Sequence, residues 1–566
     1  MIEKMTKYSF VLLNSGKDEF LENLRTLGLV DISRESKPVD EKSAGMLSEI
    51  ESGRKFLDEL RKGEDALLLE LRSKAAAAAL LADELAPWGD YDREALGGFD
   101  PHFFCVPKKS FDGNWENEYP MKIVGEENGL VRFVVLGSEL PPAKELETPK
   151  LTASEAALQA KTALKEAQDY ESALKARSGE IPSLEKKISK AESDLSLYLA
   201  SLEAEEAAEN SICVFVGFAP RTKDGELSEA FDRMDGVLWF SEKAKVEDQP
   251  PIEFRNNWFV RMFEPITDMY GRPAYDGFDP TPFISIFFLL FFAMCMGDAG
   301  YGLILIVAGI LLRKVKSFGN LAPLVITLGI GTTVVGFLFH NFFSIDFAEY
   351  MPEGIQKILV PSKVAGYDGT MILALIIGII HLCLAMIVKT VNATKNKGFL
   401  GSLATWGWTL LIVGGVVVAL IALMGVIDAR LTKIIVIILG SVSAVGIFLL
   451  NDLHRNPLLN IGSGLWETYN TVTGLLGDVL SYLRLYALGL AGGMLGFAFN
   501  DLAKMTLGDG GFGWIPFIII VLAGHALNLA MAALGAFVHP LRLNFLEFFK
   551  NSGYEAAGKK YNPLKN

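Results

Sequence analysis

The stretch Ser481-Tyr482-Leu483-Arg484-Leu485-Tyr486-Ala487-Leu488-Gly489-Leu490-Ala491 places an arginine inside one of the most apolar segments of the chain. An arginine at the centre of a bilayer costs about 2.5 to 3.5 kcal/mol on membrane-insertion scales. Its guanidinium group cannot lose a proton to avoid that cost. Arg484 therefore either has a partner or faces water.

Around this stretch, the 566 residues divide into two halves of different composition. Residues 1 to about 260 are rich in Glu, Lys and Ala, whereas a series of long apolar runs begins at about residue 280. This division predicts a cytoplasmic arm over residues 1–260 and an α-helical, polytopic membrane domain over residues 261–566.

The bulk properties exclude several classes of protein. The net charge of −14, with no basic face, argues against nucleic acid as a partner. The amino-terminal residues are charged and lack an apolar core, so they do not form a signal peptide. The cysteines are scattered without a CxxC pair, which predicts neither a disulfide framework nor a metal site; they are Cys105, Cys213, Cys295 and Cys383.

The membrane domain contains eight apolar segments that are long enough, or nearly so, to span a bilayer. The first two are short and are joined by the run Met296 to Gly302, so a broken helix pair inside the protein is an alternative for them. The last two exceed the roughly 20 residues of a perpendicular span, and we expect them to be long and tilted. The segments are 282–297, 299–314, 320–341, 370–390, 404–426, 431–450, 464–505 and 514–550.

Basic residues gather in every second loop, whereas the loops on the other side are acidic or mixed in charge. By the positive-inside rule, these basic loops, both termini and the arm are cytoplasmic. The basic positions are Arg313, Lys314, Lys316, Lys389, Lys395, Lys397, His454, Arg455, Lys559, Lys560 and Lys565.

The arm is predicted to hold two α/β lobes joined by a pair of long helices. The first lobe combines residues 1–40 with 210–248, and the distal lobe covers residues 88–145. The helices cover residues 43–86, continuing through the alanine run to Leu85, and residues 150–207, with a break near Pro182. A heptad seam in the second helix predicts an antiparallel coiled coil, with two independent solvated helices as the alternative; it comprises Leu184, Ile188, Ala191, Leu195, Tyr198 and Leu202.

No sequence motif for catalysis is found. The chain lacks a P-loop, an HExxH and a GxSxG motif, and no cofactor is expected. Residues 508–513 match GxGxxG, but they follow a membrane helix rather than a strand, so we interpret them as a turn. We therefore expect no enzymatic activity of the chain by itself.

Charged and polar side chains in the last two segments carry the functional signal. Asp478 and Arg484 are six residues apart and lie on different faces of a helix, so they are not expected to pair. Snorkelling anchors are the alternative for Glu547 and Lys550, and a static buried ion pair is the alternative for Arg484. Small-residue pairs follow Arg484 and permit close approach of another helix, within the chain or beyond it; they are Gly489 with Gly493 and Gly492 with Gly496.

These residues resemble the large membrane subunit of V-type and A-type rotary ATPases, called subunit a in eukaryotes and subunit I in bacteria and archaea. The resemblance covers essentially the whole chain, although the arm is similar in layout only. The chain resembles the bacterial form more than the eukaryotic one, and this resemblance implies a prokaryotic inner membrane. The stretches that carry the resemblance are 250–251, 269–273, 279–281, 296–302, 340–344, 456–458, 481–491 and 539–543.

The resemblance implies a stator subunit that moves ions against a rotating ring of c-type (proteolipid) subunits. Arg484 would force the ion off the buried carboxylate of each ring subunit, and Arg542 matches the second arginine of the family. Two half-channels would reach the ring from opposite sides, with the candidates Asn470, Asp478, His525, Asn528, His539 and Glu547, and the four glycines would face the ring. Further implied partners are the peripheral stalks, through them the catalytic head, and the membrane-proximal subunit of the central stalk.

The sequence departs from the eukaryotic members at three places. Gly492 and Asn544 stand where those members carry histidine, and Ala532 lies near the position of a glutamate. Because those groups help to form the proton path, the ion remains either proton or sodium. A stand-alone secondary transporter with a regulatory domain is the alternative function, although we find no inverted repeat. A purely structural membrane anchor would leave Arg484 unexplained.

Overall fold

The computed structural model describes residues 1–34, 39–90, 101–127, 129–146, 150–207, 211–315, 319, 321–348, 351–356, 359–361, 363–364, 366–448, 457–507 and 513–565. The predicted turn at 508–513 falls outside these residues except for Gly513, as do Lys316, His454, Arg455 and Asn456. The chain forms two compact units, Met1–Val11 with Val216–Pro563 and Leu12–Phe215 with Leu564–Asn566. Our boundary near residue 260 stays a prediction.

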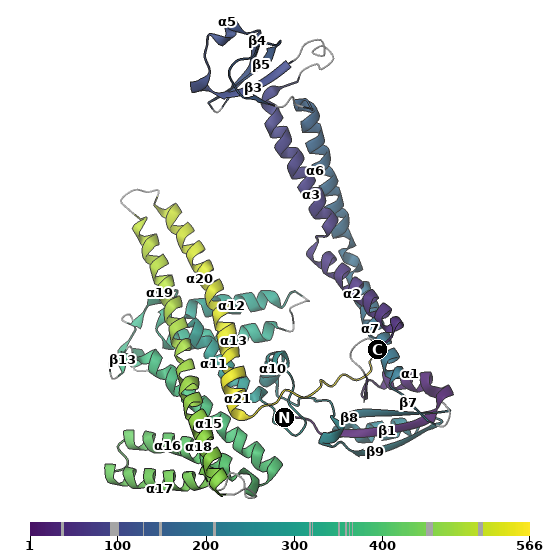
Figure 1. Cartoon of the computed structure of the whole chain (residues 1–566), viewed down its shortest axis with the longest axis vertical. Coiled ribbons are helices and arrows are strands. Elements are labelled where there is room, and N and C mark those ends of the chain that lie inside the picture. Colours follow the sequence, from purple (N-terminus) through teal and green to yellow (C-terminus); the bar gives the residue numbers. More distant parts are fainter. Residues whose placement is uncertain are drawn as a thin grey trace. The chain divides into compact units, whose positions relative to one another are not determined.

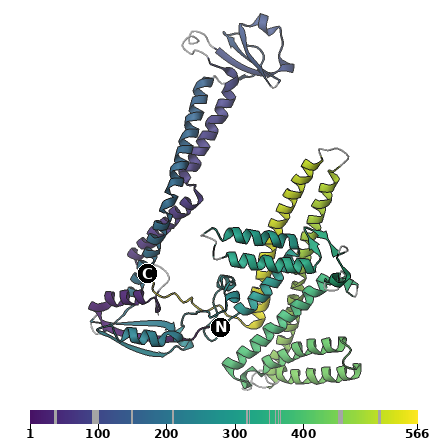
Figure 2. The ribbon, with the colours of Figure 1, turned by 180° about the vertical axis from the view of Figure 1, so that it is seen from behind.

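Four helices of the second unit pack in two pairs, as Figures 1 and 2 show. Helix α2 (Glu41–Lys62) lies beside α7 (Ile181–Leu202), and α3 (Ala66–Leu85) lies beside α6 (Ala153–Ala176). The predicted seam residues Leu184, Ile188, Ala191 and Leu195 pack against Ile50 and Leu57 of α2. The helix pairing agrees with the expected hairpin, whose assignment as a coiled coil stays a prediction.

The prediction of one continuous helix to Leu85 is wrong. Helix α2 ends where Gly63 adopts a left-handed φ of 65°, a conformation that glycine reaches without steric cost. Asp65 then caps α3 by accepting a hydrogen bond of 2.7 Å from the backbone N–H of Leu68. The predicted break near Pro182 is confirmed, because a 3₁₀ turn at Arg177–Glu180 separates α6 from α7.

Two sheets account for the predicted lobes. The first has the order β2-β8-β1-β9, with β7 also paired to β8, and its helices are α1 (Lys17–Leu27) and α8 (Asp224–Phe231). The distal sheet has the order β4-β5-β3-β6, and Phe104 of β3 lies opposite Phe133 of β5 in its core. The strands are β1 (Met5–Leu13), β2 (Asp31–Ile32), β3 (Pro101–Pro107), β4 (Met121–Glu127), β5 (Leu130–Leu136), β6 (Glu145–Leu146), β7 (Glu205–Ala207), β8 (Ile212–Pro220) and β9 (Val237–Lys243).

The apolar half of the chain is helical, and five stretches are long and apolar enough to cross a membrane: Gly369–Lys397, Leu400–Leu423, Ala429–Phe448, Asn460–Met505 and Trp514–Ser552. Three further apolar helices are shorter, α11 (Thr281–Met296), α12 (Ala299–Leu312) and α13 (Ala322–Leu338). These eight match the predicted segments, but a count of eight spanning helices stays a prediction. The remaining helices here are α9 (Trp258–Arg261), α10 (Glu264–Tyr270), α14 (Glu353–Gln356), α15 (Gly369–Lys397), α16 (Leu403–Leu423), α17 (Ala429–Phe448), α18 (Pro457–Ser481), α19 (Leu483–Met505), α20 (Trp514–Arg542) and α21 (Phe549–Ser552).

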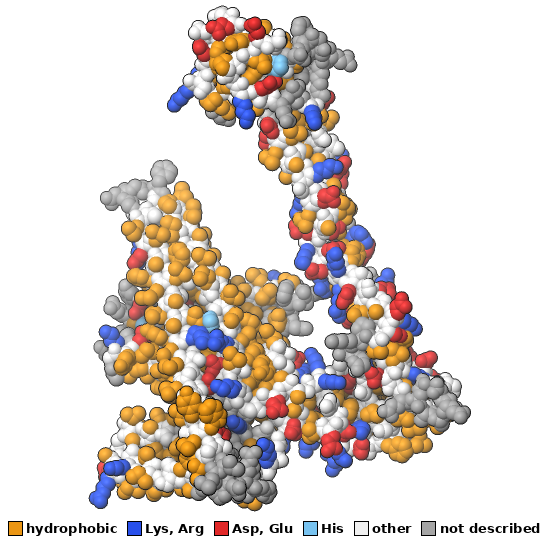
Figure 3. All heavy atoms as spheres, viewed as in Figure 1, with side chains coloured by type: hydrophobic (Ala, Val, Ile, Leu, Met, Phe, Trp, Pro, Cys, Tyr) orange, Lys and Arg blue, Asp and Glu red, His pale blue; other side chains and the backbone are white. Residues whose placement is uncertain are grey.

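The surface of the membrane helices is apolar, whereas the surface of the paired helices in the second unit is charged. Figure 3 shows hydrophobic side chains covering α16, α17, α19 and α20, whereas acidic and basic side chains are mixed along the paired helices of the second unit. Exposed side chains such as Ile437, Leu465 and Ile519 belong to this apolar surface. Because water does not favour so large an apolar face, this part of the chain is suited to lipid.

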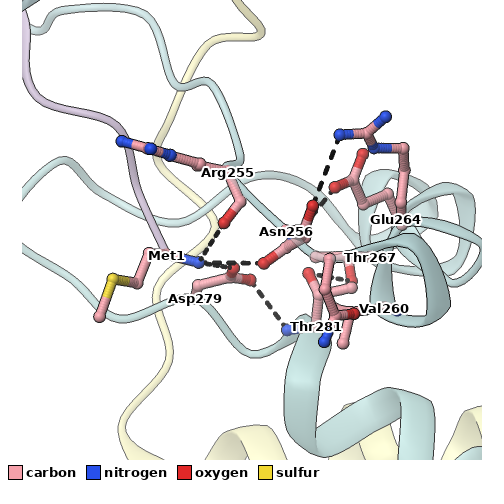
Figure 4. Close-up of polar contacts among 10 residues, drawn as sticks. Met1, Arg255, Asn256, Val260, Glu264, Thr267, Asp279 and Thr281 are labelled. Atoms are coloured by element: carbon pink, nitrogen blue, oxygen red, sulfur yellow. Dashed lines mark hydrogen bonds and ion pairs between the residues drawn. The ribbon is translucent and has the colours of Figure 1, made fainter. Parts of the chain in front are cut away.

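The linker before α11 is held from two directions within the first unit. Figure 4 shows the Met1 amino group beside Asp279, whose carboxylate oxygen lies 2.6 Å away. The tail near the carboxyl end forms backbone hydrogen bonds with the same linker, from Ile252 N–H to the Lys559 carbonyl (2.7 Å) and from Gly558 N–H to the Arg272 carbonyl (3.0 Å). We call residues Tyr554 to Tyr561 the tail strap.

Candidate functional site

Arg484 lies directly after a break in the long apolar stretch. Helix α18 ends at Ser481 and α19 begins at Leu483, so Tyr482 stands between them. The backbone N–H of Tyr482 donates to the Val479 carbonyl (3.2 Å), and that of Leu485 donates to the Tyr482 carbonyl (3.1 Å). These three-residue spacings show that the backbone beside Arg484 is wound more tightly than an α-helix.

The guanidinium group of Arg484 has no partner among the described residues. The side chain is half-buried, and its Nη1 atom is buried without a hydrogen bond. No carboxylate of the described chain forms an ion pair with it, and Asp478 is paired elsewhere. A charged donor left open in apolar surroundings is costly, so this site is suited to a charge or water that the chain itself does not supply.

Asp478 and Glu547 come together on one side of Arg484. The Asn551 amide donates to the Asp478 carboxylate (2.7 Å) and to the Glu547 backbone carbonyl (2.6 Å), and Lys550 Nζ lies 3.5 Å from Asp478. Glu547 is 4% exposed, its Oε2 atom has no hydrogen-bond partner among the residues that the structure describes, and Arg484 lies within electrostatic range of it. We call Asp478, Glu547, Lys550 and Asn551 the Asp478 cluster.

Glu547 reaches this position through a π-helical segment, Leu543–Phe548, that follows α20. Pro540 lies inside α20 and has no N–H to donate to the preceding turn, and the Asn544 side chain donates to the Pro540 carbonyl (2.8 Å). A wider turn of this kind redirects the side chains after it. Pro540 thus lies at the start of the segment that turns the Glu547 side chain inward.

A second polar group contains His525 and Asn528 of α20. His525 Nδ1 lies 2.7 Å from the Tyr301 hydroxyl, and its Nε2 lies 2.9 Å from Asn500 Oδ1. The Asn528 amide donates to the Tyr301 hydroxyl (2.9 Å) and to the Gly492 carbonyl (2.8 Å). We call Tyr301, Asn500, His525 and Asn528 the His525 network, in which both nitrogens of the histidine are bonded.

Asp298 supports this network from the start of α12. Its buried carboxylate, on a residue 1% exposed, accepts backbone N–H bonds from Gly300 (2.8 Å), Tyr301 (3.2 Å), Phe343 (2.9 Å) and Ser344 (2.7 Å). The last two residues belong to the turn between β10 (Asn341–Phe342) and β11 (Ile345–Asp346). One carboxylate therefore joins the start of α12 to this hairpin.

A cavity of about 620 Å³ lies between the hairpin and α19. Apolar side chains such as Leu485 and Phe497 line it together with Asn500, Asp346 and His340. His340 Nδ1 lies 3.0 Å from the Asp346 carboxylate. The cavity therefore brings apolar walls, an ionisable pair and one member of the His525 network together.

The other predicted site residues are placed separately. Arg542 is exposed at the end of α20, and Asn470 is exposed on α18. His539 is half-buried, its Nδ1 atom lacks a hydrogen-bond partner in the described ranges of the chain, and Arg484 and Arg542 both lie within electrostatic range of it. Both arginines therefore act electrostatically on His539.

The four glycines after Arg484 differ in their surroundings. A Cβ at Gly489 would lie 2.8 Å from the Met294 carbonyl, and one at Gly496 would overlap the Ser344 side chain. A Cβ at Gly492 would meet nothing within 4 Å among the described residues, and one at Gly493 would only touch the Asn341 amide at 3.7 Å. Two of the glycines permit contacts within the chain, and two leave the face of α19 open.

The sequence did not single out several residues of these groups. Tyr301, Asn500 and Asn551 complete the two polar groups, and His340 with Asp346 lines the cavity. Asn500 carried a usable signal, because an amide in an apolar helix requires a partner. Tyr301 stands in the stretch 296–302 that carries the family resemblance, whereas Asn551 carried no such signal.

The apolar helices and their buried polar groups define a polytopic membrane protein. A model of the V-type ATPase 116kDa subunit family matches residues 143–322. The V-type ATP synthase subunit I 1 of Treponema pallidum is 27% identical over 545 residues, covering 88% of this chain and 84% of that protein. The A-type ATP synthase subunit I of Methanocaldococcus jannaschii is 31% identical over 57% of this chain and 50% of its own length.

A third relative, the V-type ATP synthase subunit I of Borreliella burgdorferi, is 27% identical over 62% of this chain and 59% of its own. The chain thus spans most of the Treponema relative but only about half of the Methanocaldococcus one. The chain is thus similar to the V-type ATPase 116kDa subunit family over residues 143–322 and to these subunit I proteins over more of its length.

Proposed function

We propose that this chain is the stator and ion-translocating subunit of a V/A-type rotary ATPase. The observation that carries the proposal is Arg484, a permanent charge whose buried Nη1 atom lacks a partner among the described residues. A ring subunit with a buried carboxylate would supply the missing opposite charge. The names of the relatives support this assignment, since each is a subunit I of an ATP synthase.

The chemistry at Arg484 follows from electrostatics. A positive charge within a few ångströms stabilises an ionised carboxylate, so a ring carboxylate that reaches Arg484 releases its proton or sodium ion. The carboxylate takes up another ion only after it has rotated past. The fixed charge also blocks direct passage of cations between the two sides, and a lysine would be inferior because it can lose its proton.

Two polar routes would lead to this point from opposite faces. The Asp478 cluster forms the cytoplasmic route, together with His539 and with Asn544, whose Oδ1 atom is buried without a partner. The cavity of about 620 Å³ with Asp346 and Asn500 forms the route from the other face. Buried polar atoms without protein partners are sites where water is expected, and water is what a proton or sodium ion needs to move.

The orientation and the partners are part of the same proposal. The basic loops and the arm lie in the cytoplasm, and the lobes of the arm bind the peripheral stalks and the membrane-proximal subunit of the central stalk. Nucleotide binding and hydrolysis belong to the catalytic head. The exposed face of α19 around Gly492 and Gly493 meets the ring, whereas Gly489 and Gly496 serve contacts within the chain.

The decisive experiment uses the assembled complex in vesicles. Replacing Arg484 by alanine is expected to abolish ATP-driven ion uptake while the head continues to hydrolyse ATP, and Arg484→Lys is expected to restore little of the uptake. Arg430→Ala, which removes an exposed arginine at the start of α17, is the matched control and retains normal uptake. Normal pumping by the Arg484→Ala complex would overturn the proposal.

A further inference from the structure

The break before Arg484 is held by a histidine that the proposed mechanism does not use. His381 lies in the middle of α15, and its Nδ1 atom is 2.9 Å from the hydroxyl of Tyr482. Both residues are 0% exposed. Because nothing but protein surrounds this hydrogen bond, it is electrostatically stronger than the same bond would be in water.

The rings on both sides of the bond are fixed by packing. The His381 ring stacks on Phe548 with a centroid distance of 4.7 Å and an angle of 7°, and Phe287 lies 4.1 Å away on centroids. A Cβ at Gly378 would overlap the Tyr482 ring, so glycine is required one turn before the histidine. The pair thus joins α11, α15, the α18–α19 break and the π-helical segment.

Tyr482 is two residues from Arg484, and Phe548 is next to Glu547. His381 therefore contacts a residue near Arg484 and a residue next to Glu547, the two charged groups of the proposed ion path. Asp478 and Glu547 also lie within electrostatic range of the Tyr482 hydroxyl. A shift of Tyr482 would move the start of α19, and the arginine would move with it.

We propose that His381 and Tyr482 form a positioning pair, which sets the angle of the α18–α19 break and thereby aims Arg484 at the passing ring carboxylate. The inference rests on the proposed function of Arg484. Neither residue touches the ion or the carboxylate in this role, so both are positioning residues. Ion release at the ring carboxylate depends on geometry in the way that enzyme reactions do, in which a misplacement of about 1 Å can cost about a hundredfold in rate.

The test measures ions moved per ATP hydrolysed by the reconstituted complex. Tyr482→Phe keeps the aromatic ring against Gly378 and removes only the hydroxyl. We expect the ratio of ions moved per ATP to fall about fivefold, which is the size of effect that the loss of one buried hydrogen bond allows. His381→Leu is expected to lower the ratio equally. The double variant is expected to be no worse than either single one, because both changes remove the same bond.

Two further variants separate positioning from simple stability. His381→Asn places an amide near the position of Nδ1, which can donate or accept, and it is expected to retain at least about half of the ratio despite the lost ring stacking. Tyr554→Phe removes a hydroxyl that donates to the Gly271 carbonyl (2.7 Å), away from the break, and is expected to leave the ratio unchanged. The amount of assembled complex is measured for each variant.

The outcomes distinguish this inference from the function on which it rests. A wild-type ratio in the Tyr482→Phe complex, or an equal fall with Tyr554→Phe, overturns the positioning pair. So does a loss of assembled complex with no change in the ratio. Arg484→Ala is measured alongside. Normal pumping by the Arg484→Ala complex overturns the proposed function. If the Arg484→Ala complex does not pump while the Tyr482→Phe complex has a wild-type ratio, only the positioning pair is overturned.

Discussion

Asp298 and Arg484 are both charged side chains among apolar helices, yet their surroundings differ. The carboxylate of Asp298 accepts four backbone hydrogen bonds, from two segments of the chain. The buried Nη1 atom of Arg484 has no hydrogen-bond acceptor in the described part of the chain. A buried charge whose hydrogen bonds are all made within the chain stabilises one conformation. A buried charge that lacks a partner in the described chain is suited to a partner that arrives and leaves.

Replacing Asp298 by asparagine tests the structural role of the saturated charge. The amide presents a donor to backbone N–H groups that need acceptors, so we expect the free energy of unfolding to fall by about 3 kcal/mol. The measurement is reversible unfolding of the detergent-solubilised chain. Asp501→Asn, at a side chain 49% exposed, is the control and is expected to change it by less than about 0.5 kcal/mol. Equal losses in both variants would contradict the assignment.

At the scale of elements, periodicity in the sequence predicted helices, whereas it did not predict contacts between residues that lie far apart in the chain. Apolar runs predicted the eight apolar helices, because such a pattern is local. The break at Gly63 was missed, since helical periodicity continues on both sides of it and outweighed the glycine and the capping Asp65. The Asp478 cluster joins residues 73 positions apart, and no local pattern encodes such a pairing.

The predicted site shows the same division. Arg484, Asp478 and Glu547 were found because a charge in an apolar segment is conspicuous in sequence. His381 was not singled out, although it is also a polar residue in an apolar helix, because its significance depends on Tyr482 101 residues later. The different surroundings of the four glycines likewise depend on which neighbour each one meets in space.

The amino-terminal cap of α2 makes a pH-dependent contribution to stability. Asp40 accepts hydrogen bonds from the Ser43 side chain (2.5 Å) and from the hydroxyl of Tyr198 in α7 (2.5 Å), and these lower its pKa from 3.8 to about 2. A lowered folded-state pKa stabilises the fold above the unfolded pKa, and this stability is lost as the pH falls through the folded value.

The pH dependence is measured as a difference in Tm between the full chain and its Asp40→Asn variant. Wild type is expected to have the higher Tm, by an amount that is constant above about pH 4 and shrinks toward zero as the pH falls to about 2. Taking the difference cancels the titration of the other carboxylates. A difference that grows on acidification would show that the sign of the shift is wrong.

At the scale of the whole molecule, each compact unit has its own means of stability. The second unit relies on helix pairs with mixed surface charge and on a small distal sheet core. The first has a continuous apolar core that extends from Phe263 through α11 to Tyr554. Tyr554 begins the tail strap, so residues far apart in sequence share one core with the linker.

The tail strap can be loosened by one methyl group. A Cβ at Gly558 would overlap the Pro273 carbonyl, so Gly558→Ala is expected to break the backbone bond to Arg272 and to expose the linker. Trypsin should then cleave at Arg255 or Arg261 several-fold faster than in wild type. Gly225→Ala, where a Cβ would meet no atom of the described residues within 4 Å, is the control and is expected to leave cleavage unchanged. Unchanged cleavage of Gly558→Ala would show that the strap does not protect the linker.

The tail strap also has a consequence for the order of synthesis. The strap residue Tyr554 is translated 283 residues after its partner Gly271. At about 5 to 20 residues per second, the ribosome needs on the order of 15 to 60 seconds to cover that interval. During this time the membrane helices are being inserted while the linker still lacks its final backbone partners. The linker of the emerging chain is thus open to proteases and chaperones until the tail strap has been translated.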